Sequence, residues 1–415
     1  LAGMAWRHLL NVVGAVIGAI GVTMLVSAGV SLIYQEWSTA VWITVAAVAT
    51  TAIGLVLWRS FGRPGELSTR EGFAAVALAW IAIGLVGALP YLFTQSITNV
   101  TDAMFETVGG FTTTGSSVIP DPGALPHGIQ FWRSFTQWLG GMGIIVLSIA
   151  ILPLLGMGAV QLARAESPGP MPDRLTPRFK ETAKRLWIVY VALTAVEVLL
   201  LWVGEMTLFE SVNHAFTTMS TGGYSTNAGS LNAFSDYSQW IVIMFMVLAG
   251  TSFALHYRAT RTPRVYLRST EFRVYLGITA AAAAVMIVGT WGGSVHDTIR
   301  DALFTSASMI TTTGYGTADF GLWKPALQIM IVGLMFVGGM AGSTAGSVKI
   351  YRHEVLYEAS RVDIRRLIHP RGIFVARIGR NPLRDDIVEA VQTFFLLYMF
   401  AFMTGSFALA VIASI

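Results

Sequence analysis

Three runs of threonine, serine and glycine recur along the chain, and their residue types and spacing favour ion chemistry. In each run an acidic residue stands thirteen positions before a glycine, with hydroxyl side chains between the two. The pairs are Asp102 with Gly115, Glu210 with Gly223, and Asp301 with Gly314. Because glycine adopts backbone angles that other residues avoid, the carbonyls next to it can all turn to one side. Carbonyl oxygens arranged in this way can replace the water shell of a monovalent cation.

Each run needs a short helix to present it. About ten semi-apolar residues follow each acid, and the acid suits the N-terminus of a half-helix, where it caps free amides and opposes the helix dipole. The negative end of that dipole would then point at the hydroxyl and glycine residues. Irregular backbone at membrane depth is tolerated only where it lines a cavity or packs within protein. The pattern therefore predicts re-entrant loops that line a pore.

For any one loop the alternative is a surface turn, which the same residue types favour. Three gapless copies, each between two apolar segments and on the same side, favour the pore. A ring of four loops is the natural closure, and three copies precede Ile415. Either a fourth copy lies beyond this residue or the pore is completed in another way.

The composition requires a membrane. Of the 415 residues 54% are hydrophobic and 12% are charged, whereas soluble domains are about 25% charged, and the mean hydropathy is +0.63. A segment of about 20 apolar residues spans a bilayer, and one further segment, 186–204, is interrupted only by Glu197. The segments without any charge are 8–35, 37–58, 72–101, 134–163, 237–257, 274–296, 325–348 and 390–415. Nine spans are therefore predicted in an all-α polytopic membrane protein, since helices satisfy their own backbone in lipid.

The basic residues predict the orientation. With a cytoplasmic N-terminus, 24 of the 27 lysines and arginines fall on the inner side, and only Arg133, Arg300 and Lys324 fall outside. The outer loops hold ten acids, Glu106 among them, so the outer face would attract cations. We expect contact with membrane lipid and no nucleic-acid partner. Cysteine is absent, which excludes thiol chemistry and disulfides.

Longer motifs resemble a known family. Segment 131–146 reads Phe-Trp-Arg-Ser-Phe-Thr-Gln-Trp-Leu-Gly-Gly-Met-Gly-Ile-Ile-Val, and it is followed by Arg-Ala-Glu-Ser-Pro-Gly-Pro at 164–170 and Pro-Arg-Phe-Lys-Glu-Thr-Ala-Lys at 177–184. Together with the three loops and segment 338–349, these motifs closely resemble the TrkH branch of the Trk/Ktr/HKT potassium transporters. The resemblance covers nearly the whole chain. The two leading spans look like this branch rather than KtrB, which lacks them.

The resemblance implies four membrane-pore-membrane units in a pseudo-fourfold arrangement around a central pore, two extra N-terminal helices, and a homodimer. The expected divisions are 1–70 for the leading helices, 71–163, 164–258 and 259–352 for three units, and 353–415 for the start of an incomplete fourth unit. The fourth filter segment and the last helix are unassigned.

The resemblance also implies the residues that select the ion. Potassium is the expected ion, with rubidium as a surrogate, and Gly115 stands where plant relatives that prefer sodium carry serine. The implied selectivity filter comprises Thr112, Thr113, Thr114, Gly115 and Ser116; Ser220, Thr221, Gly222, Gly223 and Tyr224; and Thr311, Thr312, Thr313, Gly314 and Tyr315.

A second glycine-rich segment interrupts the span 325–348. Glycine, serine and threonine weaken a helix in mid-membrane, so an unwound loop beneath the filter is expected. The alternative is a small-residue packing face between helices. The resemblance favours an intramembrane gate that comprises Gly338, Gly339, Gly342, Ser343, Thr344, Gly346, Ser347 and Lys349.

The resulting expectation is potassium uptake across the bacterial cytoplasmic (inner) membrane, without catalytic residues or a cofactor. Glu197 is the one acid within a span, and such a carboxylate suggests a proton or ion site as readily as a buried helix contact. Proton- or sodium-coupled symport is therefore the alternative. His214 and His256 lack ligand partners at useful spacing, and structural roles are expected. The resemblance implies a cytosolic nucleotide-binding regulator of the TrkA type, with RCK domains.

Overall fold

The computed structural model describes residues 6–62, 69–151, 176–379 and 381–413. The part of the predicted span 134–163 after residue 151 and the motif at 164–170 lie outside these residues. Within them, six helices are long and apolar enough to cross a membrane, or seven with a bent pair. The chain is an all-α polytopic membrane protein, as expected, apart from one two-residue hairpin in which β1 (Arg377–Ile378) pairs antiparallel with β2 (Asn381–Pro382).

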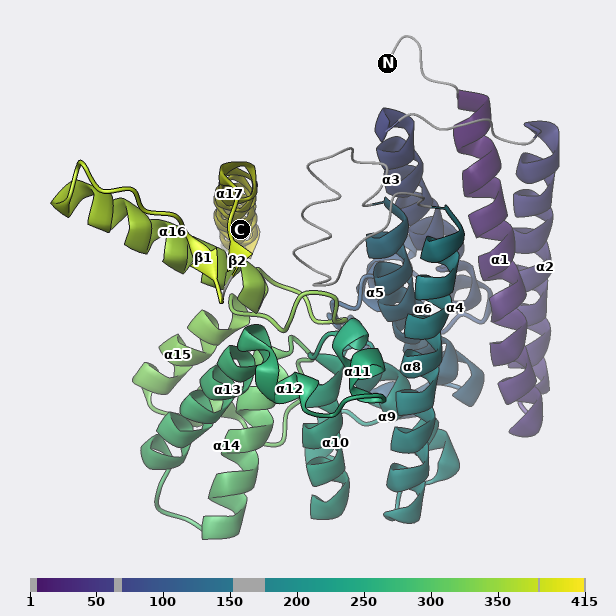
Figure 1. Cartoon of the computed structure of the whole chain (residues 1–415). Coiled ribbons are helices and arrows are strands. Elements are labelled where there is room, and N and C mark those ends of the chain that lie inside the picture. The colour runs from purple at the N-terminus through teal and green to yellow at the C-terminus, as the bar shows by residue number, and fades with distance from the viewer. Residues whose placement is uncertain (1–5, 63–68, 152–175, 380, 414–415) are drawn as a thin grey trace.

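The helices repeat a three-part pattern of span, half-helix and second span (Figure 1). The first unit has α3 (Thr69–Val86) with α4 (Leu89–Phe93), then α5 (Val100–Phe111) and α6 (His127–Ile151). The second has α8 (Thr176–Val203), α9 (Leu208–Met219), and α10 (Asp236–Ala249) with α11 (Phe253–Ala259). The third has α12 (Val265–Arg268) and α13 (Thr270–Gly289), then α14 (Val295–Ile310) and α15 (Pro325–Met335). Each half-helix is followed by a loop and a 3-10 turn, at Pro122–Ala124, Ser230–Ala233 and Phe320–Leu322.

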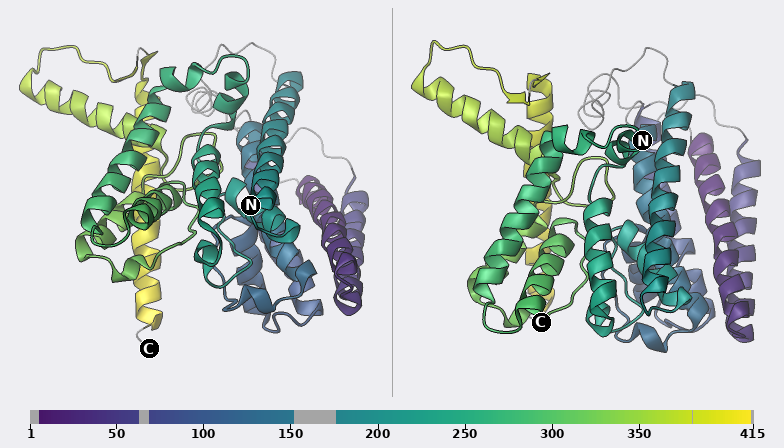
Figure 2. Two further views of the ribbon diagram at one scale, coloured as in Figure 1. Left: turned by 90° about the horizontal axis from the view of Figure 1, so that it is seen from below. Right: turned by 60° about the horizontal axis from the view of Figure 1, so that its bottom comes forward.

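The leading and trailing helices flank these units. Helices α1 (Trp6–Ile33) and α2 (Trp37–Ser60) lie side by side at one edge, and α16 (Ile350–Ile368) and α17 (Asp385–Ala413) lie toward the opposite edge (Figure 2). The predicted span 237–257 is bent by 99° between α10 and α11. The predicted span 325–348 holds only the short helix α15, after which the helix is broken.

The three half-helices begin in different ways. Helix α9 starts with a capping box, because Thr207 accepts from the amide of Glu210 and the Glu210 side chain accepts from the amide of Thr207. Asp102 lies in the first turn of α5, where Asn99 is the cap. The prediction was wrong for the third loop: α14 begins four residues earlier than the other half-helices relative to the repeat, and Asp301 lies inside it. There Asp301 accepts from Arg300 and from Thr317 instead.

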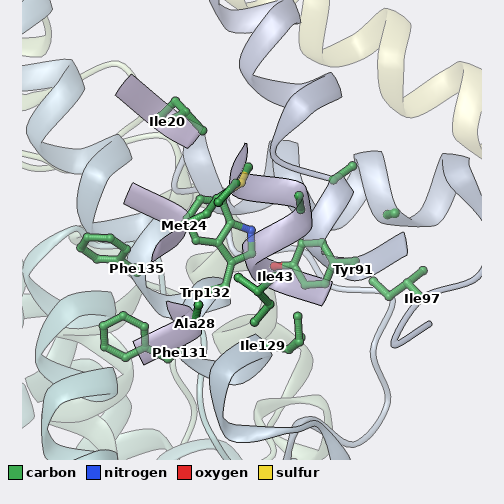
Figure 3. Packing of buried hydrophobic residues seen from close by; sticks show 14 of the residues in the cluster. Ile20, Met24, Ala28, Ile43, Tyr91, Ile97, Ile129, Phe131, Trp132 and Phe135 are labelled. Carbon is green, nitrogen blue, oxygen red and sulfur yellow. The ribbon is translucent and has the colours of Figure 1, made fainter. Parts of the chain in front are cut away.

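A buried apolar cluster fixes the first unit against the leading helices (Figure 3). Trp132 of α6 is fully buried among Met24, Ile43 and Tyr91, which come from α1, α2 and α4. The indole of Trp132 also donates to the carbonyl oxygen of Gly87 at 3.1 Å. Helix α6 is thereby held at a fixed depth, and it carries the polar side chains that contact the filter loops.

Helices α1 and α2 approach each other through glycine. A Cβ on Gly54 would overlap the backbone of Gly18, and one on Gly14 would lie 2.6 Å from the amide nitrogen of Trp58. Close backbone approach of this kind strengthens van der Waals packing in lipid, where apolar burial alone gives little driving force.

We expect Gly54→Leu to force α1 and α2 apart and to destabilise the protein by about 1–3 kcal/mol or more, as overpacking does. Gly29→Leu is the matched control, because a Cβ on Gly29 of α1 meets nothing within 4 Å. Thermal unfolding in detergent, followed by tryptophan fluorescence, measures both. Equal midpoints for the two variants would contradict the close contact.

Candidate functional site

The three loops at 112–116, 220–224 and 311–315, which carry the predicted filter residues and are called the filter loops for that prediction, share one unusual backbone conformation. Each has a left-handed threonine and, two residues later, a left-handed glycine. The φ angles are +55° at Thr113, +54° at Thr221 and +57° at Thr312, then +75° at Gly115, +74° at Gly223 and +82° at Gly314. A left-handed β-branched residue costs about 1–3 kcal/mol and persists only where its surroundings impose it. The sequence repeat is therefore also a structural repeat, strained at equivalent positions.

The loops lie side by side in chain order. A Cβ on Gly115 would overlap the carbonyl oxygen of Gly222, and one on Gly223 would overlap that of Thr313. The glycine of each loop thus faces the carbonyl just before the glycine position of the next loop. Gly314, at the end of the series, has no described neighbour within 4 Å of such a Cβ. The three loops therefore form an arc. At its third loop, the space next to Gly314 is open where a Cβ would point.

Two tyrosines connect the loops to one another. The Tyr224 hydroxyl of the second loop donates to the carbonyl oxygens of Glu106 at 3.1 Å and Ser116 at 3.0 Å, both in the first unit. The Tyr315 hydroxyl of the third loop bonds the Thr217 hydroxyl in the second unit. Both tyrosine side chains are buried. The second and third loops are therefore each anchored to the preceding loop. In the first loop, Ser116 occupies the position that the tyrosines hold in the other two.

Helix α6 supports the second loop directly. The Gln137 side chain donates to the carbonyl oxygen of Gly222 at 2.9 Å and accepts from the amide of Tyr224 at 3.2 Å. One buried amide thus fixes two filter residues. Gln137 was not among the candidate residues predicted from the sequence, although a polar amide in a charge-free span was the available signal.

A buried ion pair lies behind the first two loops. Arg133 of α6 donates through Nε to Oε1 of Glu106 on α5 at 2.5 Å, and both side chains are almost fully buried. The second carboxylate oxygen of Glu106 accepts from the Val118 amide at 3.0 Å. The guanidinium reaches the carbonyl oxygen of Ser225 at 3.3 Å and lies 4.0 Å from the centre of the Tyr224 ring.

This pair changes one expectation from the sequence. Arg133 is one of the three basic residues placed on the outer side, and it pairs with an acid placed on the same side. Glu106, however, was counted among the acids of the outer face, whereas its side chain is buried and neutralised. It stabilises the loops and adds nothing to an exposed negative surface.

The segment after α15 is an irregular loop. No regular element is present between Met335 and Ile350, and the backbone is left-handed at Gly338, Gly342, Ser347 and Lys349. The Lys349 ammonium donates back to the carbonyl oxygen of Ser343 at 3.3 Å. The helix is therefore broken where glycine and hydroxyl residues gather, as the sequence predicted.

This loop contacts the filter segments. The amide of Gly346 donates to the hydroxyl of Thr312 at 2.7 Å. The hydroxyl of Thr344 donates to the carbonyl oxygen of Met219, the last residue of α9, at 3.0 Å. The Ala341 amide donates to Glu271, at the start of α13, at 2.7 Å. The irregular loop thus lies directly against the second and third loops.

The remaining candidates take structural positions. Glu197 is fully buried in α8, and its carboxylate oxygens have no hydrogen-bond partner among the described residues. His214 is hydrogen bonded to the Glu210 carbonyl and the Ser225 hydroxyl, and His256 to the Leu248 carbonyl and Tyr266. Both histidines are thus occupied by structural contacts.

We expect Arg133→Met to destabilise the protein by about 3–5 kcal/mol, because Glu106 would remain buried without its counter-charge. The double variant Arg133→Met/Glu106→Met should recover much of this loss, since no buried charge is left. Thermal unfolding of the single and double variants in one detergent measures the difference. A double variant less stable than the single variant would contradict the ion pair.

Comparison with known proteins shows the family. The chain matches the family described as "TrkH: Cation transport protein" over residues 40–280 and 286–414. It is 38% identical over 416 residues to the Trk system potassium uptake protein TrkH of Salmonella typhimurium, covering 98% of this chain and 86% of the relative. It is 37% identical over 415 residues to the protein of the same name from Escherichia coli K12, with the same coverage.

A solved structure shows the same fold. The crystal structure of the potassium transporter TrkH from Vibrio parahaemolyticus is similar with a TM-score of 0.89 and 34% identity, over 97% of this chain and 85% of that one. The overall fold is thus shared with a potassium transporter. The chain belongs to the TrkH branch of the Trk cation transporters.

Proposed function

We propose that this protein takes up potassium across the bacterial cytoplasmic membrane through a carbonyl-lined selectivity filter. The observation that carries the proposal is the identical left-handed threonine and glycine in three adjacent loops. Such a backbone can present successive carbonyls to an ion in place of water. The printed names of the relatives, which describe potassium uptake, support the same ion.

The contacts between loops explain how selectivity arises. A filter discriminates between potassium and sodium through the number and spacing of its carbonyl dipoles. Tyr224, Tyr315 and Gln137 fix the spacing between neighbouring loops from behind. A loop anchored in this way resists collapse around the smaller ion, so the filter favours the larger one.

The irregular loop 338–349 acts as the gate. It contacts Thr312 of the third filter loop and the end of α9, so it lies next to the path of any ion that leaves the filter. Backbone hydrogen bonds and left-handed residues hold it in place without a continuous helix. Opening requires those few contacts to break, which is a smaller change than moving a whole span.

The wider assembly follows from the charge distribution and the family resemblance. The N-terminus lies in the cytoplasm with most basic residues, and two chains form a homodimer in the inner membrane. A cytosolic regulator of the TrkA type, with RCK domains that bind a nucleotide, acts on the gate from the inner side. No enzymatic step is involved.

Coupled symport is the alternative mechanism, and Glu197 is the observation that favours it. Its carboxyl group is fully buried and without a hydrogen-bond partner among the described residues, as a proton-carrying group would be. A requirement for a proton or sodium gradient would support this mechanism over a passive pathway.

Rubidium uptake into liposomes tests the proposal. The full chain is reconstituted into liposomes that contain potassium. Rubidium uptake is then measured with sodium or potassium as the competing ion, and no proton or sodium gradient is imposed. We expect potassium to compete far better than sodium. Gly115→Ser should reduce this difference about tenfold or more, because its side chain would displace the Gly222 carbonyl.

Gly277→Ser is the control, since a Cβ on Gly277 of α13 meets nothing within 4 Å. Equal competition by the two ions in the wild type would overturn the selective pathway. Uptake that appears only with an added proton or sodium gradient would instead support symport. Unchanged selectivity in Gly115→Ser would place Gly115 outside the filter.

A separate prediction concerns the gate. Thr312→Val removes the hydroxyl that accepts from the Gly346 amide, so the closed loop loses about 1 kcal/mol and basal rubidium uptake should rise about fivefold. Thr44→Val is the control, because the Thr44 hydroxyl bonds only its own helix, at Ala40. The ratio of potassium to sodium competition, measured in parallel, separates gating from a damaged filter. Lower or unchanged uptake in Thr312→Val would exclude this contact from the closed gate.

A further inference from the structure

A cavity of about 740 Å³ lies away from the filter, between the third unit and the segment that leads into α17. Its walls come from α11, α12, the start of α13, α16 and the β1–β2 hairpin. Gly379 of the hairpin lies close to Thr270, the first residue of α13, since a Cβ on this glycine would be 3.7 Å from the Thr270 hydroxyl oxygen. The charged residues that line it are Arg258, Arg268, Arg273, Arg384, Glu271 and Glu354.

The cavity has an excess of positive charge. Arg268 forms no ion pair with any residue that the structure describes, and Arg384 pairs with Asp386, which is not part of the lining. The Glu271 carboxylate is already engaged by the Ala341 amide. Burial raises the pKa of Glu354 to about 7, with Glu358 adding to the rise and Arg273 opposing it. This acid is thus about half protonated near pH 7 and repels an anion less than an ordinary carboxylate.

A helix start adds to the attraction for anions. Helix α13 is 20 residues long, and its first residues, with Ser269 as the cap, line the cavity. The N-terminus of such a helix carries a partial positive charge and free amides that favour phosphate. Arginine complements this geometry, since its guanidinium donates two parallel hydrogen bonds to phosphate oxygens.

Apolar side chains beside the arginines indicate that the ligand is amphiphilic. Leu255, Val265, Leu383 and Ile387 line the same cavity. Two membrane spans, α13 and α17, both begin at this level, so the cavity opens where lipid headgroups lie. A soluble anion would gain nothing from the apolar part, whereas a lipid would extend its acyl chains along the spans.

We propose that this cavity binds the phosphate headgroup of an anionic phospholipid from the cytoplasmic leaflet. Basic pockets between membrane helices on the cytoplasmic side bind such headgroups, and this placement rests on the orientation in the proposed function. Arg268 and Arg273 hold the phosphate, and α13 contributes its N-terminal amides.

The position of the cavity connects the lipid to the gate. Glu271 lines the cavity and also accepts from Ala341 of the gate loop. Glu354 lies in the second turn of α16, which begins directly after that loop. The gate loop is thus attached to two walls of the cavity, to α13 through Glu271 and to α16 through the chain itself. A bound headgroup fixes the distance between these two helices.

Lipid retention measures the binding. The full chain is extracted from vesicles of phosphatidylcholine with phosphatidylglycerol, and bound lipid is counted by native mass spectrometry. We expect the wild type to retain phosphatidylglycerol, and Arg268→Gln/Arg273→Gln to retain about tenfold less. Arg365→Gln/Arg371→Gln is the matched control, because it removes two exposed arginines on the same side that do not line the cavity.

The outcomes distinguish a lipid headgroup from a free phosphate ion, and they test the lipid site separately from the transport proposal. Equal loss in both double variants would show nonspecific attraction and overturn the site. Displacement of the lipid by inorganic phosphate would assign the cavity to a soluble phosphate and would contradict the proposed lipid binding. Rubidium uptake in the same vesicles separates the two proposals. Uptake without arginine-dependent retention overturns only the lipid site, whereas arginine-dependent retention without uptake in any vesicle overturns only the transport proposal.

Discussion

The ion pair between Arg133 and Glu106 is the interaction on which the filter depends. A carbonyl can face an ion only if the rest of its loop is held from behind, and that support must be found inside the membrane, where water is absent. The pair supplies charge, hydrogen bonds and an aromatic contact to Tyr224 within one small volume. It connects α5, α6 and the first two filter loops.

The same principle distinguishes the filter loops from the irregular loop 338–349. The filter loops are braced by buried side chains from neighbouring units, such as Gln137 and Tyr315. The irregular loop 338–349 is held by hydrogen bonds of its own backbone and of short hydroxyl side chains, and its Met340 and Val348 side chains are buried. The two kinds of irregular backbone therefore differ in what supports them, although both occur in the same protein.

The sequence predicted the spans, the three loops and the broken helix because each leaves a local signal in composition. Charge-free segments, hydroxyl runs and clustered glycines can be read without knowing what they contact. The partners of Gln137 and Tyr224 could not be read in this way, since those contacts join residues 85 to 118 positions apart. The third half-helix was placed wrongly because Ser294 caps it earlier, and an acid inside a helix looks the same in sequence as an acid at its start.

The tyrosine contacts all run in one direction along the series of loops, from a later unit to the unit before it. The second unit presents a tyrosine hydroxyl to the backbone of the first, and the third presents one to the Thr217 hydroxyl of the second, so these neighbouring units meet head to tail. An interface of this heterologous kind closes into a ring when the rotation between units is a fraction of a full turn. A single ancestral unit with both halves of this contact would already have been complementary to its own copy. Gene duplication could then build a closed ring without inventing a new interface.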